Sequence, residues 1–332
     1  TPLYDPGKVY NAAIQSATVP DRVGSALVAI AGKLDFKSLA YADFYRWVNR
    51  PDNGLSTRFA ATMFVFERGM GEQTPEVSDR IIQFWSGDRI GVGQLRGWVK
   101  ELGESATYKI DKVSVKDLAL QRYCFVPRLM LAAGYAGWVV LLDEVELLGK
   151  YSLRQRARSY GEIARLMGKL ETDPMPGLTT VLAISHEFEG AVMIERNEEE
   201  KIPNRLRAGG SEGELLLASE AERGMRIIGR DRLLLVGPTP ATIERVHEKL
   251  IGIYSDAYDW APPVDRPSRH PQDNIRKHIK RWITEWDLKR LYPDYTPEIH
   301  VEDVLQNYSE MPELEQDAGD DPGDGGAYVA VS

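Results

Sequence analysis

The spacing of apolar residues changes along the chain and divides it into predicted elements. From about residue 20 to 130, apolar residues recur every three or four positions between short loops, which predicts a series of helices. Residues 138–142 form an apolar run without alternation, and residues 178–184 are β-branched and apolar; a glycine directly precedes each segment. Short runs of this kind predict strands buried on both faces, as in the centre of a parallel sheet. The pattern therefore predicts an α/β protein with a large helical part.

Further elements are predicted after the second run. Residues 187–222 are polar and contain glycine-rich turns, which predicts loops, and two short apolar stretches within 227–236 predict a strand or strand pair. The Thr-Pro pair at the start of 239–258 is typical of a helix cap followed by the first helical residue. A second amphipathic helix is predicted over 273–290. The acidic, glycine-rich composition of 309–332 predicts a disordered tail.

Composition narrows the class of protein. The 332 residues leave room for one large domain or two smaller ones. The net charge of −9 argues against a protein that coats nucleic acid non-specifically. No run approaches the roughly 18 apolar residues of a membrane helix, and the first residues do not have the pattern of a signal peptide. Cys124 is the only cysteine, so no internal disulfide can form. We therefore expect a cytoplasmic protein without a membrane segment.

Polar side chains follow both predicted strands. Asp143 and Glu144 come directly after the first apolar run, and Ser185 follows the second. Open α/β sheets bind ligands at the carboxyl ends of their strands. In P-loop NTPases an apolar strand ending in Asp-Glu is the Walker B element. In AAA+ ATPases a polar residue at the end of the neighbouring strand is sensor 1. The alternative is a core strand that happens to end in charged loop residues. His186 is expected to be an ordinary loop histidine.

The phosphate-binding loop of P-loop proteins is missing from the sequence. That loop has the pattern Gly-x-x-x-x-Gly-Lys-Ser/Thr, whose amides and lysine hold the phosphates. Four Gly-Lys pairs occur, and none has the required glycine before it or Ser/Thr after it. Two explanations stay open. Either the loop lies upstream of Thr1, or the fold is P-loop-like and does not bind nucleotide.

Several segments together resemble one family. They are residues 1–5 (Thr-Pro-Leu-Tyr-Asp), 8–10 (Lys-Val-Tyr), 134–137 (Gly-Tyr-Ala-Gly), 139–146 (Val-Val-Leu-Leu-Asp-Glu-Val-Glu) and 257–260 (Ala-Tyr-Asp-Trp). In this combination and order the chain resembles bacterial AAA+-like ATP-binding proteins found in phage-exclusion (BREX) gene clusters. In that family the Thr-Pro-Leu segment follows a strand that comes after the Walker A helix. The resemblance therefore implies that this chain begins downstream of its phosphate loop.

The resemblance implies a fold and a division of the chain. It implies an AAA+-like P-loop NTPase core, a parallel sheet flanked by helices, over residues 1–237, with a helical insertion at about 20–130. Residues 238–308 would form a C-terminal α-helical lid that closes on nucleotide, and 309–332 the acidic disordered tail. Lids of this kind couple the nucleotide state to conformation.

The resemblance also implies roles for single residues. Asp143 would be the carboxylate that holds Mg²⁺, Glu144 the base that positions water, and Ser185 the sensor that contacts the γ-phosphate or the water. Arg205 or Arg207 would be an arginine finger that reaches a neighbouring subunit of a homo-oligomer. The cofactors would be ATP and Mg²⁺, with ATPase activity if the upstream loop is present. The partners would be other defence-system proteins.

Two other functions stay open. The chain can serve as a non-catalytic scaffold that docks other defence proteins through the arginine-rich helix at 151–170 or through the acidic tail. It can also contact DNA phosphates through a basic helix face. The residues of that face are Arg276, Lys277, Lys280 and Arg281. Among the residues after Asp143-Glu144, Glu146 is expected to be structural.

Overall fold

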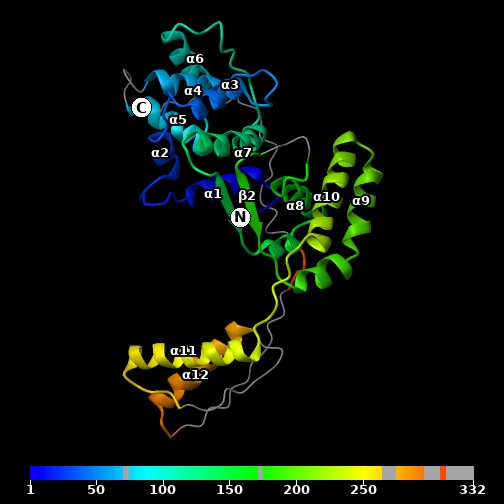
Figure 1. The fold of residues 1–332 in the computed structure, drawn as a ribbon. Helices are drawn as coiled ribbons and strands as arrows, with labels where there is room; N and C mark the ends of the chain where they lie inside the picture. The colour runs from blue at the N-terminus through cyan, green and yellow to red at the C-terminus, as the bar shows by residue number, and fades with distance from the viewer. Residues whose placement is uncertain (70–74, 171–174, 264–273, 295–306, 312–332) are drawn as a thin grey trace, which may run out of the picture. The chain divides into compact units, whose positions relative to one another are not determined.

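The computed structural model divides into two compact units, which we describe separately (Figure 1). Unit 1 is Thr1–Asp231 together with the segment that starts at Tyr308, and unit 2 is Arg232–Asn307. The structure describes residues 1–69, 75–170, 175–263, 274–294 and 307–311. The predicted acidic tail lies outside these residues from position 312 onward, as do parts of the predicted lid segment.

Unit 1 begins with helices, as predicted. They are α1 (Pro6–Gln15), α2 (Ala26–Ala31), α3 (Leu39–Val48), α4 (Thr57–Gly69), α5 (Pro75–Ser86), α6 (Val92–Glu101) and α7 (Val115–Ala132). Phe59, Trp85 and Phe125 form the centre of their aromatic core, and all three are fully buried. The rings of Phe59 and Phe125 lie 4.9 Å apart, and Trp85 Nε1 donates to Thr62 Oγ1 at 3.1 Å. Burial of such large rings stabilises the helical layer.

Helix α7 joins the helical layer to the sheet. Its Phe125 belongs to the aromatic core, while its Tyr123 stacks on Trp138 with ring centroids 6.5 Å apart. Tyr10 of α1 meets the same tryptophan edge-on at 6.0 Å. Two helices thus cover the face of the sheet on which Trp138 lies.

The sheet described here has two parallel strands. Strand β1 (Trp138–Leu142) pairs with β2 (Leu178–Leu182) in register, from Trp138 opposite Leu178 to Leu142 opposite Leu182. The two chain segments lie very close together where the strands begin, because Trp138 N donates to Gly177 O at 2.7 Å. A Cβ on Gly137 would lie 2.3 Å from Gly177 O, and Gly137 has a φ of 136°. Only glycine fits both demands. The predicted parallel strand pair is confirmed.

The prediction that both faces of the strands are buried is wrong. Side chains of β1 alternate between buried and exposed, with Val139 62% and Leu141 73% exposed. Their neighbour Val181 on β2 is 51% exposed. Helices of the described residues cover one face only, so the other face of this sheet is apolar and open. A continuous apolar run cannot show that one face is open, because it depends on residue types and not on which elements pack against the strand.

The rest of unit 1 follows the strands as helices. They are the 3₁₀-helix η1 (Val145–Lys150), α8 (Leu153–Leu166), the π-helix η2 (Glu189–Ile194), α9 (Glu198–Gly209) and α10 (Glu212–Arg230). The prediction of loops over 187–222 is therefore wrong, apart from the turn at 195–197 and the turn at Gly210, whose φ is 74°. The polar composition suggested loops because α9 and α10 bury only a narrow apolar stripe, so most of their residues are polar.

The strand or strand pair predicted within 227–236 is also wrong. Ile227 and Ile228 lie inside α10, where they continue the buried stripe of Ala221 and Met225. Residues 233–236 form no strand and are exposed, Leu235 at 89%. A strand needs a partner for its main-chain groups, and no described segment supplies one here.

Unit 2 contains the two predicted helices, α11 (Pro240–Tyr258) and α12 (Ile275–Leu291). Thr239 Oγ1 caps α11 by accepting from Thr242 N at 3.2 Å. Tyr254, Trp282 and Trp286 form the core of this unit.

The basic face predicted on α12 needs one correction. Arg276 and Lys280 are exposed, but Arg281 is only 8% exposed. Arg281 lies three residues after His278 and next to Trp282, so helical spacing places it beside the buried stripe. It is therefore not part of a solvent-facing basic surface.

No helix in the described part of the chain is long and apolar enough to cross a membrane.

Candidate functional site

The predicted site residues lie where the two strands end. Because β1 and β2 are parallel and in register, their carboxyl ends lie at the same edge of the sheet. Main-chain bonds continue the contact beyond the strands: Ala183 N donates to Leu142 O at 2.8 Å, and Val145 N donates to Ala183 O at 3.1 Å. The segments that hold Asp143-Glu144 and Ser185 are thereby brought side by side, as the sequence predicted.

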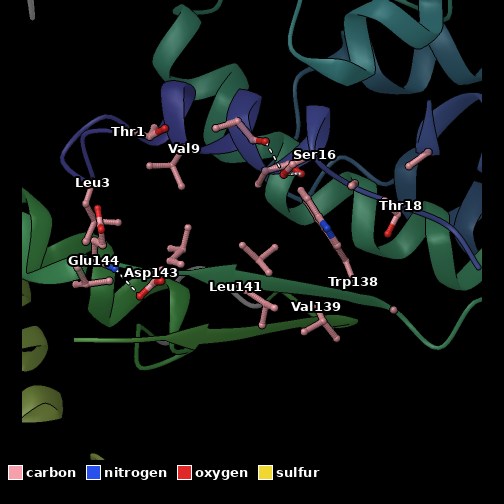
Figure 2. A pocket seen from close by; sticks show the side chains of 18 of the residues that line it. Thr1, Leu3, Val9, Ser16, Thr18, Trp138, Val139, Leu141, Asp143 and Glu144 are labelled. Carbon is pink, nitrogen blue, oxygen red and sulfur yellow. Dashed lines mark hydrogen bonds between the residues drawn. The ribbon is translucent and has the colours of Figure 1, made fainter. Parts of the chain in front are cut away.

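The acidic pair sits on a sharp turn. Glu144 has φ 57° and ψ 38°, a left-handed conformation that is uncommon outside glycine. Asp143 Oδ1 accepts from Glu144 N at 2.9 Å, which stabilises the turn from β1 into η1 (Figure 2). Both side chains are exposed, so their carboxylates are free to meet a ligand. Strained main-chain conformations of this kind are concentrated at functional sites.

A cavity of about 700 Å³ extends from this turn along β1. Asp143 and Glu144 line one end, and residues 138–142 of β1 line its length (Figure 2). Apolar and small residues of α1, among them Val9, form the opposite side. The cavity is therefore mostly apolar, with carboxylate oxygens at one end.

One edge of β1 borders this cavity. Trp138 and Leu142 use their main-chain groups to bond β2. Since the residues of a parallel strand bond alternately to its two neighbours, Val139 and Leu141 direct theirs to the opposite edge. None of the described residues forms a strand on that edge. A segment bound there would extend the sheet.

Glu146 ties the two segments together. Its side chain is 7% exposed, and Oε2 accepts from Ser185 N at 3.1 Å. This bond fixes the main chain of Ser185 relative to the turn that carries Glu144. The sequence interpretation of Glu146 as structural agrees with this contact.

Ser185 has a second partner that the sequence did not reveal. The hydroxyl of Tyr308 lies close enough to the Ser185 side chain to interact with it. The amide of Glu187 also points at Ser185 Oγ, at the longer distance of 3.4 Å. No local pattern links Tyr308 to Ser185, because the chain passes through all of unit 2 between them.

The two candidate finger arginines lie away from the cavity. Both are on α9 and exposed. Arg207 forms an ion pair with Glu222 of α10 at 2.7 Å. Neither Arg205 nor Arg207 lines the cavity beside Asp143. Within one chain the structure does not bring them to the site.

The donor set suits hard cations, among them Mg²⁺, Ca²⁺ and Mn²⁺. Among the described residues, no group of three or more His, Cys, Asp or Glu side chains could hold a metal ion. Asp143 and Glu144 offer hard carboxylate oxygens at an exposed turn. Mg²⁺ is commonly bound through one or two carboxylates together with substrate phosphates and waters. The pair therefore fits a magnesium ion that arrives with a nucleotide.

Comparison with known proteins supports the resemblance over the centre of the chain. Residues 110–190 match the family model described as BREX system ATP-binding protein BrxC/D. The matched segment is less than half of the chain and contains α7, both strands, Asp143-Glu144 and Ser185. The match associates this segment with ATP binding and with a phage-defence system. No significant match was found among curated proteins or among solved structures.

Proposed function

We propose that the protein is an ATP-binding and ATP-hydrolysing AAA+-like switch or motor subunit of an anti-phage BREX system. The observation that carries the proposal is the in-register parallel pairing of β1 and β2. It joins Asp143-Glu144 to Ser185 at one edge of the sheet, inside the segment that matches an ATP-binding family. Ligands of open α/β sheets bind at this edge.

Each site residue has a role that follows from its position. Asp143 would hold the Mg²⁺ that neutralises charge on the β- and γ-phosphates. Glu144 would orient the attacking water and accept its proton, because its carboxylate is exposed on the same turn. Ser185 would donate its hydroxyl to the γ-phosphate or to that water. Glu146 holds the main chain of Ser185 and so sets its distance from Glu144.

The proposal needs a phosphate-binding loop in addition to these residues. The sequence has no Gly-x-x-x-x-Gly-Lys-Ser/Thr pattern. The open edge of β1 and the exposed apolar face at Val139, Leu141 and Val181 support a sheet completed by a further segment. We propose that this segment supplies the amides and lysine that hold the phosphates.

The remaining roles belong to the same proposal. Residues 1–237 would be the core, with the helices of about 20–130 as an insertion. Residues 238–308 would be the lid, and either Arg205 or Arg207 a finger that completes the site of a neighbouring subunit. The exposure of both arginines on α9 is compatible with a role between subunits.

The variant Glu144→Gln in the intact protein tests the proposal. The amide keeps the shape of the side chain and removes its basicity, so we expect ATP affinity to stay within about twofold. Turnover should fall by about a hundredfold or more. ATP with Mg²⁺ at 100 times its dissociation constant should stabilise both proteins by about 2.7 kcal/mol, measured as a thermal shift.

Two results would contradict the proposal. Normal turnover by Glu144→Gln would remove the role of Glu144. No effect of ATP and Mg²⁺ on the melting temperature of the intact wild-type protein would favour a non-catalytic scaffold.

A further inference from the structure

The chain returns to unit 1 in a short segment that we name the clasp, Tyr308–Met311. The side chain of Tyr308 is 5% exposed, and its ring meets Phe188 edge-on with centroids 6.0 Å apart. Phe188 directly precedes η2, the helix that follows Ser185. The clasp is therefore anchored beside the segment that carries Ser185.

Polar contacts join the clasp to η1 as well. Arg196 Nη1 donates to Gly149 O at 2.9 Å, and its other terminal nitrogen donates to the carbonyl of Tyr308. Met311 N donates to Lys150 O at 2.9 Å. Since η1 follows the turn at Glu144, the clasp touches the elements that continue from both halves of the candidate site.

A buried charge fixes the far end of the clasp. Arg156 Nη1 lies 2.6 Å from the carboxylate of Glu310, and the Arg156 side chain is 1% exposed. Arg156 Nε lies 2.8 Å from Glu198, which is fully buried. A buried cation demands such partners, since leaving it unpaired is costly.

Gly149 makes room for the tyrosine. A Cβ at this position would lie 3.0 Å from Tyr308 Cδ1 and 3.0 Å from Val192 Cγ2. This spacing is tighter than ordinary side-chain contacts, so the ring of Tyr308 fills the space that the glycine leaves.

The hydroxyl of Tyr308 reaches Ser185. The two side chains lie close enough to interact, and the carboxylates of Glu146 and Glu187 are near enough to act on the phenol. Burial raises the pKa of Tyr308 above its ordinary value; Ser185 opposes this increase, and the charges of Glu146 and Glu187 add to it. Ser185 is thus held at its main chain by Glu146 and at its side chain by Tyr308.

We propose that Tyr308 is a positioning residue of the nucleotide site, which holds the Ser185 hydroxyl in place and makes the site depend on a seated clasp. The proposal rests on the proposed function, because it assumes that Ser185 contacts nucleotide or water. The clasp directly follows residues 232–307 in the chain. A rearrangement of that segment that unseats the clasp would therefore release Ser185 and slow hydrolysis.

The variant Tyr308→Phe removes the hydroxyl and keeps the ring against Phe188 and Gly149. In the intact protein we expect kcat for ATP hydrolysis to fall about fivefold to tenfold, with the ATP dissociation constant within about twofold of wild type. The control is Tyr41→Phe, which also removes a buried hydroxyl, one that donates to Glu67 at 2.9 Å in the helical layer. It should leave kcat unchanged.

A double-mutant cycle separates positioning from general loosening. In a Ser185→Ala background, Tyr308→Phe should cause no further loss of kcat, because the group that it positions is gone. Equal losses in both backgrounds would overturn the proposal, as would a wild-type kcat in Tyr308→Phe.

Hydrogen exchange tests the clasp without ATP. Tyr308→Ala should speed amide exchange in residues 144–150 and 183–195, while exchange in α3 and α4 stays as in wild type. Unchanged exchange in the first two segments would overturn the proposal even if the wild-type protein hydrolyses ATP. A wild-type protein that neither binds nor hydrolyses ATP would refute the proposed function instead. The exchange result would still show whether the clasp stabilises the segments around Glu144 and Ser185.

Discussion

The buried pair Arg156 and Glu198 allows a quantitative test of what holds the site region together. The side chains are 1% and 0% exposed, and Nε lies 2.8 Å from the carboxylate. Tyr160, also fully buried, donates to the other oxygen of Glu198 at 2.8 Å. Neither charge can be rehydrated without opening the packing of α8 and α9, so removal of Arg156 leaves the Glu198 carboxylate buried without this cation.

Arg156→Met keeps an unbranched apolar side chain and removes the charged guanidinium group. We expect a loss of about 3–5 kcal/mol in the free energy of unfolding, the range for breaking a buried pair from one side. Glu198→Gln should cost less than Arg156→Met, because Arg156 retains the carboxylate of Glu310, which is 54% exposed. The double variant should lose less than the sum of the single losses, since no unpaired charge remains.

Urea unfolding followed by tryptophan fluorescence measures these differences as shifts in the midpoint at constant slope. The control is Arg50→Met, which removes an ion pair to Asp52 of similar length, 2.7 Å, on the surface. Both of its side chains are more than half exposed, so the midpoint should not move measurably. If Arg156→Met shifted the midpoint no more than Arg50→Met, or if the double variant lost the full sum, burial would not be the cause.

Two further predictions concern the sheet and unit 2. Gly137→Ala should destabilise the protein by about 2 kcal/mol or more, measured by thermal unfolding, because it combines a φ of 136° with a Cβ 2.3 Å from Gly177 O. Burial lowers the pKa of His247 below 6.5, against the raising effect of Glu248 and Glu285. The folded state then binds protons less readily than the unfolded state, so the melting temperature should drop as pH falls below about 6.5. In His247→Phe this drop should be smaller; an equal drop would assign it to other groups.

Local patterns were sufficient for several features of the site. The apolar runs before Asp143 and Ser185, each preceded by a glycine, located both strands and the carboxylates at the end of the first. The spacing of apolar residues located most helices. These features depend on residues close together in the chain. Their spacing follows the repeat of 3.6 residues in a helix and of two in a strand.

Features that depend on neighbours were predicted poorly. The runs at 138–142 and 178–182 do not show that one face of the sheet is open, and Leu235 in its apolar stretch does not show that a strand partner is missing from the described residues. Arg281 was assigned to the polar face of α12, although packing buries it. In each case the exposure of a side chain depends on which other elements pack against it. The residue type alone does not specify those elements.

Residue types and their spacing were enough to predict two strands with Asp143, Glu144 and Ser185 directly after them. The contacts that hold these residues became visible only in three dimensions: the parallel register, the bond from Glu146 to Ser185, and the packing of Tyr308, which follows unit 2 in the chain. Such contacts join segments far apart in the chain. The positions of these contacts follow from the packing of whole helices and strands. Residue spacing along the sequence therefore cannot predict them.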